Sequence, residues 1–387
     1  MTAPLYAAPA EQGQRGPGVP AFTVRPGYRV TLAAERVGEG RFIEFDDKGT
    51  LYLAGIRNGK VWAWKDKDGD GVYETETLFL ENQRHVHGLC WYDGWLWFAP
   101  STAVGKARDT NGDGKADDVE IVLKDLPGGS GHLWRSLLVT KDGLWTSVGD
   151  PGNITDQTDT DREKIWFYQH DGSGKKLWSS GLRNTEKLRM RPGTTEIWGA
   201  EHGSDWFGGP LGDKAGRQPI TDLWPPDEFN HYVEGGFYGH PFLVGPRVPR
   251  VESQKRPDLI DLAAKTIAPG WMFGAHWATN GFGFVSNENK MFPPDHRGDA
   301  FVGCHGSWNS QTRVGYRVER VMFDKWTGKP FGSQMIVSTL NAQAPGSDDV
   351  LGRPVDCAEA PDGSILFTVD APGARIYRIS WVGEKTE

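Results

Sequence analysis

One local pattern recurs six times in this chain and constrains the fold more than any other feature. Each copy has an apolar strand, a tight turn built on Asp-Gly or an equivalent, and a second strand with Leu, Ile or Phe, in most copies beside an aromatic residue. Glycine supplies the positive φ that such turns need, and the alternating flanks bury one face of each hairpin. The pattern therefore predicts six hairpins. Their turn glycines are Gly49, Gly94, Gly143, Gly193, Gly298 and Gly363.

These repeats predict an all-β fold, a six-bladed β-propeller with long loops over one mouth. The turn glycines are spaced like propeller blades, except for a long insertion between the fourth and fifth copies. The first copy continues into strand-like segments 60–64 and 75–80, so four strands form a blade. A closed ring protects strand edges that an open stack would expose. Segment 28–34 precedes the first hairpin, and we expect it to complete the last blade and close the ring.

The rest of the chain is arranged around these repeats. Residues 1–22 have the Pro/Gly-rich character of a flexible N-terminal tail, and residues 23–387 form a single propeller domain. Segments 204–227 and 240–270 are Pro/Gly-rich insertions with weak periodicity, which we expect to lie over one mouth of the ring. Long loops on a rigid scaffold usually carry function.

Composition excludes several classes of protein. Gly and Pro make up about 20% of the 387 residues, against roughly 12% in an average chain, which favours many turns. Hydrophobic residues at 37% and aromatic residues at 12% are too abundant for a disordered chain. The sequence has no apolar run of about 18 residues, so it predicts no membrane span. With 43 basic and 51 acidic residues and no basic cluster, nucleic acid is not an expected partner.

Two acidic loops fit the pattern of a calcium-binding loop. The second, segment 66–77, supplies Asp66, Asp68 and Asp70 but has Thr77 where a bidentate Glu is expected. The flanks of both loops read as strands, so we expect calcium to staple a surface turn there, the alternative being an acidic solvated turn. The first loop matches at every ligand position, with Asp109, Asn111, Asp113, Lys115, Asp117 and Glu120 as its expected ligands.

Polar residues recur where inner strands of several blades begin or end. In a propeller these positions line the axial funnel, so we expect the side chains to converge there. A lone His in a strand is more often structural, and the functional interpretation therefore depends on convergence. Arginines beside His and Asn could hold an anionic planar ligand and take up a proton. The set comprises His132, Asp150, Arg183, Asn184, Glu201, His202, Gly203, His305 and Arg353.

The segments that hold these residues resemble a known family. They are Gly131–Arg135, Ser147–Asp150, Gly181–Asn184, Glu201–Gly203, Pro226–Asn230, Gly235–Gly239, His305–Asn309, Arg313–Tyr316 and Gly352–Pro354. In them the chain resembles the soluble quinoprotein sugar dehydrogenases, and more closely the L-sorbosone dehydrogenase branch of that six-bladed family. The resemblance spans the chain from about residue 28 to residue 381.

The resemblance implies a pyrroloquinoline quinone (PQQ) at the axis, with calcium polarising its carbonyl. It makes His132 the general base that takes the substrate hydroxyl proton, and Asp150 the residue that orients this base. Arg183 and Asn184 would contact the quinone and the charge developing on its carbonyl oxygen. The other implied cofactor contacts are His202, His305, the carbonyls of Gly203 and Ser204 toward the calcium, and Arg353 toward a cofactor carboxylate. A structural calcium site would use Asp227, Glu228 and the Tyr238 carbonyl.

The implied activity is oxidation of an alcohol or aldehyde, sugar-like or polyol, with electrons passed to an external quinone or cytochrome. Three features depart from the family. Segment 304–312 contains no Lys or Arg where the sugar enzymes place a cofactor-binding Lys, residue 204 is Ser where they commonly have Pro, and residues 208–224 are inserted. Two alternatives stay open. One is a calcium-dependent hydrolase or lyase of the lactonase kind, and the other is a non-catalytic carbohydrate-binding propeller.

The compartment follows from the implied cofactors. Quinoproteins and low-affinity calcium loops belong outside the cytosol, where calcium is abundant, so a periplasmic or secreted protein is expected. The N-terminus lacks the basic and apolar regions of a leader peptide, which leaves a cytoplasmic location open.

Overall fold

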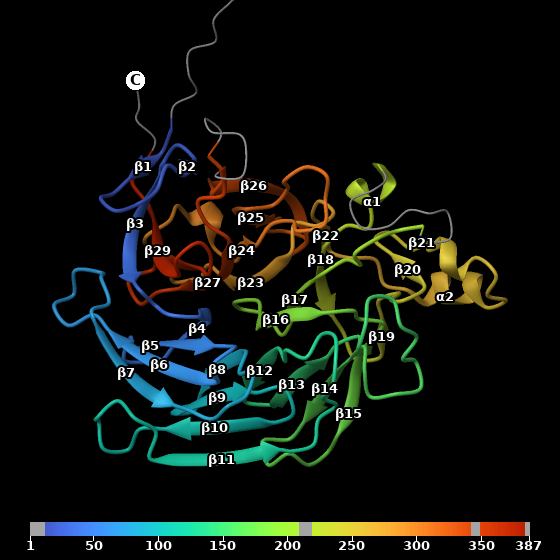
Figure 1. The fold of residues 1–387 in the computed structure, drawn as a ribbon, viewed down its shortest axis with the longest axis horizontal. Coiled ribbons are helices and arrows are strands. Elements are labelled where there is room, and N and C mark those ends of the chain that lie inside the picture. Colours follow the sequence, from blue (N-terminus) through green and yellow to red (C-terminus); the bar gives the residue numbers. More distant parts are fainter. Residues whose placement is uncertain (1–11, 209–218, 342–348, 384–387) are drawn as a thin grey trace, which may run out of the picture.

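The strands of this computed structural model form the predicted six-bladed propeller (Figure 1), and the structure describes residues 12–208, 219–341 and 349–383. Blade one contains β4 (Gly40–Phe45), β5 (Leu51–Gly55), β6 (Lys60–Lys65) and β7 (Thr75–Leu80). Blade two contains β8 (Gly88–Tyr92), β9 (Trp95–Ala99), β10 (Val104–Arg108) and β11 (Asp118–Leu123). Blade three contains β12 (Leu137–Thr140), β13 (Gly143–Val148), β14 (Lys164–Tyr168) and β15 (Lys176–Ser180), with the short β19 (Gly236–Phe237) added in parallel.

The remaining three blades follow the same order from the axis outward. Blade four contains β16 (Thr185–Met190), β17 (Ile197–Glu201), β18 (Glu228–Tyr232) and β22 (Trp271–Met272). Blade five contains β23 (Thr279–Phe284), β24 (Ala300–Cys304), β25 (Arg317–Phe323), β26 (Pro330–Ser338) and β2 (Thr23–Val24). Blade six contains β27 (Pro354–Glu359), β28 (Ile365–Val369), β29 (Arg375–Trp381), β3 (Tyr28–Glu35) and β1 (Gln14–Arg15).

The innermost strands form a closed ring around the axis. Each of β4, β8, β12, β16, β23 and β27 contacts the next, and β27 contacts β4. The ring is sealed as predicted, because β3 pairs antiparallel with β29, which places Val30 opposite Ile379. This closure leaves each inner strand beginning or ending close to the axis, which is where the predicted polar set lies.

The repeated hairpins explain the core. All six predicted turn glycines have positive φ, from +74° to +144°. A side chain at Gly143 would in addition place its Cβ 2.4 Å from the carbonyl oxygen of Tyr168. The first aliphatic or Phe residue of each second strand is at most 2% exposed, at Leu51, Leu96, Leu144, Ile197, Phe301 and Ile365. Burial of these residues between blades supplies the hydrophobic stabilisation of the ring.

Part of the predicted tail packs on the propeller. Within residues 12–22, Gly13 N donates to Val24 O (2.8 Å) and Gly16 N donates to Val30 O (2.8 Å). Phe22 is 1% exposed and packs in the core of blades five and six. Hydrogen bonds to strand edges and burial of an aromatic ring therefore hold this segment, whereas residues 1–11 lie outside the described residues.

The insertions between β17 and β23 contain short helices that weak periodicity did not predict. They are α1 (Pro219–Leu223), α2 (Leu259–Lys265) and one 3-10 turn (Val251–Ser253), and a small hairpin of β20 (Leu243–Val244) and β21 (Val248–Pro249) lies beside them (Figure 1). A second 3-10 turn (Pro294–His296) lies between β23 and β24. None of the helices in the described ranges is long and apolar enough to cross a membrane.

Candidate functional site

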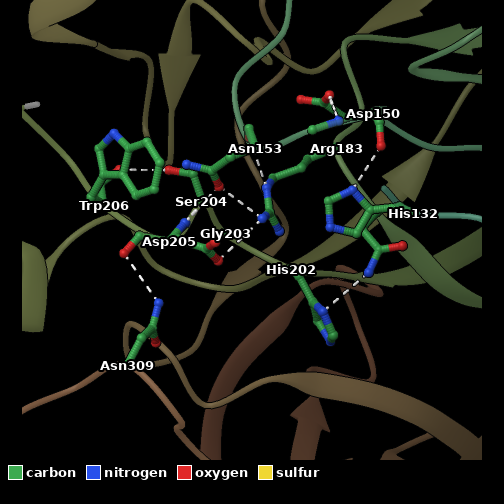
Figure 2. Close-up of polar contacts among 12 residues, drawn as sticks. His132, Asp150, Asn153, Arg183, His202, Gly203, Ser204, Asp205, Trp206 and Asn309 are labelled. Atoms are coloured by element: carbon green, nitrogen blue, oxygen red, sulfur yellow. Dashed lines mark hydrogen bonds and ion pairs between the residues drawn. The ribbon is translucent and has the colours of Figure 1, made fainter. Parts of the chain in front are cut away.

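His132 is fixed by Asp150, which lies two residues after the second strand of its blade. Its backbone N–H and its ring Nδ1 both lie at hydrogen-bond distance from the carbonyl oxygen of Asp150, at 3.0 and 2.9 Å (Figure 2). A carbonyl oxygen only accepts, so Nδ1 carries the hydrogen and Nε2 is left with a free lone pair. Burial, and then the positive charge of Arg183, lowers the pKa of His132 to about 3. The ring is therefore a neutral proton acceptor.

The expected orienting contact of Asp150 with His132 is made by its backbone carbonyl, and its carboxylate makes no hydrogen bond with His132 among the described residues. Its oxygens accept from the N–H groups of Gly152 (2.6 Å) and Thr155 (2.9 Å) and from His240 Nε2 (2.9 Å). Burial alone would raise the pKa of this carboxyl, but His240 and the two N–H groups hold it well below its usual range. Asp150 thus orients the base through its backbone, while its carboxylate shapes the loop that follows.

Arg183 is held by two residues that sequence reasoning missed. Its Nε donates to the carbonyl of Asn153 (2.9 Å) and its Nη2 to the side-chain Oδ1 of Asn153 (2.8 Å), as Figure 2 shows. Nη2 also lies 3.3 Å from Asp205 Oδ1. Both partners are in loops, and only the position of Asp205, directly after Gly203 and Ser204, could have pointed to it.

Asn184 and His202 lie next to Arg183 and connect to a buried carboxyl. Asn184 Nδ2 lies 2.6 Å from Glu186 Oε1 and 3.2 Å from His202 Nδ1. Burial raises the pKa of Glu186 to about 7. Burial, and then the positive charge of Arg183, lowers the pKa of His202 well below its ordinary value. Blades three and four therefore bring His132, Arg183, Asn184 and His202 together.

His202 also presents an unused polar atom to the site. Its Nε2 is buried and makes no hydrogen bond of normal geometry among the described residues, although the Asn280 side chain lies near the ring. A buried polar atom without a partner costs free energy, roughly 1–3 kcal/mol. An orphaned nitrogen beside Arg183 is therefore a position for a ligand atom.

The other predicted residues, His305 and Arg353, line a cavity of about 280 Å³. His305 Nε2 lies 2.8 Å from Asp370 Oδ1, and burial lowers the pKa of His305 to about 4. Arg353 donates to the carbonyls of His305 (3.0 Å) and Gly306 (2.6 Å). The cavity is lined by Gly38, Glu39, Arg41, Ile56, Arg57, Trp134, His305, Arg353, Asp370 and Ala371.

Arg41 is a further residue that sequence reasoning missed. It lies on β4, its Nη1 is 3.4 Å from Asp370 Oδ2, and its guanidinium lies 5.2 Å from the ring centroid of Trp134. Its Nε is buried without a hydrogen-bond partner among the described residues. Its place near the start of an inner strand, as for His132 in blade three, was the available signal. Trp134, two residues after His132 in the sequence, also lines this cavity.

Gly203 and Ser204, the residues expected to face a cofactor calcium, are held by hydrogen bonds to two buried side chains, Asp227 and Arg250. Gly203 N donates to Asp227 Oδ1 (2.8 Å), and the Ser204 hydroxyl lies 2.6 Å from Nη1 of Arg250. Arg250 is fully buried and also donates to the carbonyl of Trp206 (2.7 Å). These hydrogen bonds fix the positions of Gly203 and Ser204.

Of the three residues expected to bind a structural calcium, two line one cavity and the third does not. Glu228 and Tyr238 line a small cavity of about 30 Å³, which has room for one water or ion. Asp227, by contrast, accepts from the backbone N–H groups of Gly203 and Thr279. Burial raises the pKa of both Asp227 and Glu228 to about 7. Glu201, opposite Glu228 in the sheet, takes the place expected for Asp227 in the cavity wall.

The structure favours the second acidic loop over the first as a calcium site. Asp66, Asp68, Asp70 and Glu74 each offer a carboxylate oxygen within 4.8 Å of the others. Glu74 was missed because the spacing of a calcium loop between two helices places the last ligand at Thr77. In this protein strands β6 and β7 flank the loop instead. The missed signal was a Glu eight residues after the first Asp.

The first loop keeps only part of its predicted set together. Asp109 caps the N–H groups of Gly112 and Gly114. Asp117 accepts hydrogen bonds from Thr110, Asn111 N and Asn111 Nδ2. Glu120 lies on β11, where its carboxylate is 3.0 Å from Lys106 Nζ. The remaining predicted ligands Asp113 and Lys115 bond each other, Lys115 N to Asp113 Oδ1.

Calcium binding at the second loop is therefore testable. Glu74→Gln removes one of four gathered carboxylates and should weaken one calcium site on the order of tenfold in a calorimetric titration. Glu120→Gln, which also removes one exposed carboxylate, should leave that site unchanged. Loss of binding in the Glu120 variant with normal binding in the Glu74 variant would reverse this assignment.

Comparison with known proteins places the chain in a family. The model of a family described as a domain of unknown function, DUF7133, matches residues 18–372. The chain belongs to the DUF7133 family. An uncharacterized protein of Borreliella burgdorferi is 30% identical over 203 residues, which cover 51% of this DUF7133 chain and 47% of that relative. The match thus spans about half the length of the curated relative.

Solved structures share the fold of this DUF7133 protein at low identity. The holo PQQ domain of pyranose dehydrogenase from Coprinopsis cinerea has a TM-score of 0.78 and 16% identity, covering 95% of this chain and 100% of that one. The calcium structure of an AA12 carbohydrate-active enzyme from Trichoderma reesei has a TM-score of 0.78 and 19% identity, covering 96% and 99%. The apo soluble aldose sugar dehydrogenase from Escherichia coli has a TM-score of 0.63 and 18% identity, covering 91% and 100%.

Proposed function

We propose that this protein is a PQQ-dependent dehydrogenase that oxidises an alcohol or aldehyde group of a sugar-like or polyol substrate. The observation that carries the proposal is His132, whose Nδ1 is tied to the Asp150 carbonyl and whose Nε2 is free beside Arg183. The shared fold supports it, since two of the solved relatives are described with PQQ or calcium.

The residues present fit an anionic planar cofactor. Arg41, Arg57 and Arg353 line one cavity, so carboxylates there would meet positive charge and guanidinium donors. Arg41 comes from blade one and supplies a cation that the Lys-free segment of blade five lacks. Nε of Arg41 and Nε2 of His202, which are buried without a well-formed hydrogen bond among the described residues, could be satisfied by polar atoms of a bound quinone.

The chemistry divides between the chain and the cofactor. When bound, PQQ would accept a hydride from the substrate carbon, with calcium at the Gly203 and Ser204 carbonyls polarising its carbonyl. His132 Nε2 takes the proton of the substrate hydroxyl, and Nδ1 keeps its hydrogen on the Asp150 carbonyl. Arg183, held by Asn153 and only 7% exposed, stabilises negative charge that develops next to it.

The pKa of His132 should depend on whether an anionic ligand is bound beside it. The charge of Arg183 is the second cause of that low pKa, after burial. An anionic ligand that pairs with Arg183 would remove part of this effect and raise the pKa of His132 toward its ordinary value. The ring would then be a stronger base with the ligand in place than without it.

The alternatives have less support from the site. A calcium-dependent hydrolase or lyase needs several carboxylate oxygens at an open metal site, and two of the candidate carboxylates, Asp150 and Asp227, already accept from N–H donors. The convergence of His132, Arg183 and His202 also has no use in a non-catalytic carbohydrate-binding propeller. We further propose that the protein belongs to the L-sorbosone dehydrogenase branch, passes its electrons to a quinone or cytochrome, and is periplasmic or secreted.

Cofactor binding tests the arginines directly. Arg41→Ala and Arg353→Ala should each raise the dissociation constant of PQQ about ten- to hundredfold, because each removes a charged hydrogen-bond donor. Arg29→Ala removes the same charge from an exposed position on β3 and serves as the control. Calorimetric titration of PQQ in the presence of calcium measures all three. Equal affinities in the wild type and both cavity variants would contradict the placement of the cofactor.

A further inference from the structure

A buried histidine outside the predicted set, His240, bonds the carboxylate of Asp150 and lies near a second buried carboxylate, Glu163. His240 Nε2 lies 2.9 Å from Asp150 Oδ2 and 3.5 Å from Glu163 Oε1. His240 is 8% exposed, Glu163 is 3% exposed and Asp150 is fully buried. His240 belongs to the insertion that follows β19, and Glu163 directly precedes β14, so segments far apart in the sequence converge on one carboxylate.

The backbone holds both residues in place for this contact. His240 N donates to the carbonyl of Gly181 (3.1 Å), two residues before Arg183. Glu163 has a φ of +59°, a left-handed conformation that is uncommon for a residue other than glycine. Its carbonyl accepts from Leu182 N (3.2 Å). Strain of this kind persists where surrounding structure requires it, and it is often found at functional sites.

The direction of the hydrogen bond follows from the partners. Because His240 Nε2 lies between the carboxylates of Asp150 and Glu163, Nε2 carries a hydrogen and donates it to Asp150. Glu163 Oε1 has no hydrogen-bond partner among the described residues and lies 3.5 Å from His240 Nε2, so its electrostatic contact is with the same ring. His240 is thereby aimed at Asp150 from one side and held by Glu163 on the other.

Asp150 transmits this contact to two parts of the site. Its backbone carbonyl fixes Nδ1 of His132, and its carboxylate caps the loop through the N–H of Thr155. That loop carries Asn153, whose carbonyl and side chain both hold Arg183. Movement of Asp150 would therefore displace the base and the cation together.

We propose that His240, supported by Glu163, is a positioning residue that fixes the Asp150 loop and with it the tautomer of His132 and the place of Arg183. It lies behind the site and acts only through Asp150. Its effect on turnover rests on the proposed dehydrogenase function, whereas its effect on the His132 ring does not.

The test compares a variant that keeps the donor with one that removes it. His240→Gln retains an N–H donor, and His240→Leu removes it at similar size. In apoprotein with ¹⁵N-labelled histidine, NMR should show the Nδ1–H form of His132 in the wild type and the Gln variant. The Leu variant should show a mixture of both tautomers. Its PQQ dissociation constant should rise and its turnover fall, each by about tenfold, as expected for loss of a supporting contact.

Several outcomes would overturn the proposal. A merely structural His240 would lower the melting temperature of the Leu variant while the His132 tautomer stays fixed. Zinc or calcium bound at Asp150, Glu163 and His240, and lost in both the Leu and Gln variants, would show a metal site instead. If the Leu variant does not fold, Glu163→Gln tests the same support, and an unchanged His132 spectrum in it would count against the proposal. Absence of PQQ turnover in the wild type would contradict the dehydrogenase function but leave the NMR result decisive.

Discussion

His132→Gln should lower the turnover of the PQQ-loaded protein by a factor of about 100 or more, the usual contribution of a general base. The amide of Gln cannot accept a proton at neutral pH, although it can still donate to the Asp150 carbonyl that now holds Nδ1. Binding of PQQ should change little, because the arginines that hold it are untouched. Turnover is measured with a dye acceptor on an alcohol or aldose that the wild type oxidises.

A matched substitution separates the base from a general effect of losing a histidine. His170 is partly buried, lies 2.7 Å from the carbonyl of Thr140 and stacks on Tyr92 at the loop between β14 and β15. His170→Gln should leave turnover unchanged. Near-normal turnover in the His132 variant, with PQQ bound, would remove His132 from the reaction.

The largest expected loss of stability is at Lys187. Its Nζ lies 2.6 Å from both carboxylate oxygens of Asp356, and the two side chains are 6% and 0% exposed. Lys187 is on β16 of blade four and Asp356 on β27 of blade six, and Asp356 also accepts from Ile43 N (2.9 Å) on blade one. One buried ion pair therefore links three blades across the axis.

Lys187→Met should lower the free energy of unfolding by about 3–5 kcal/mol, since it leaves the Asp356 carboxylate buried without its partner. The double variant with Asp356→Asn should recover much of this loss, because the unpaired charge is gone and an acceptor for Ile43 remains. Urea unfolding of the two single variants and the double variant measures the coupling.

An exposed pair provides the control for Lys187. Lys141 and Asp142 are 2.8 Å apart, with side chains 83% and 53% exposed. Lys141→Met should change stability little, as surface pairs usually do. A loss below about 1 kcal/mol for Lys187→Met would contradict its role as a link between blades.

The fold was predictable because its signal is local and repeated. Glycines such as Gly94 and Gly363 mark turns that need positive φ, and the aliphatic residue of each second strand is buried in every blade. His132 and Arg183 were predictable for the same reason, because strand ends in a ring must approach the axis. The ordered contacts of Phe22 were not, since a Pro/Gly-rich segment does not show which strand edge it will meet.

The rest of the site depends on contacts that no local pattern records. Asp150 and His240 are 90 residues apart, and one of them lies in an insertion. Sequence spacing also cannot tell whether the carbonyl or the carboxylate of Asp150 faces His132. Arg41 was missed because a compensating cation was sought in blade five, while the ring brings one in from blade one. Glu74 was missed because the spacing of a loop between helices was applied to a loop between strands.

The central claim is that the axial residues hold PQQ, and calorimetric titration of PQQ into the calcium-loaded apoprotein tests it most directly. The geometry of Arg41, Arg353 and His202 predicts saturable binding of one PQQ per chain. Absence of saturable binding, at any calcium concentration, would contradict it.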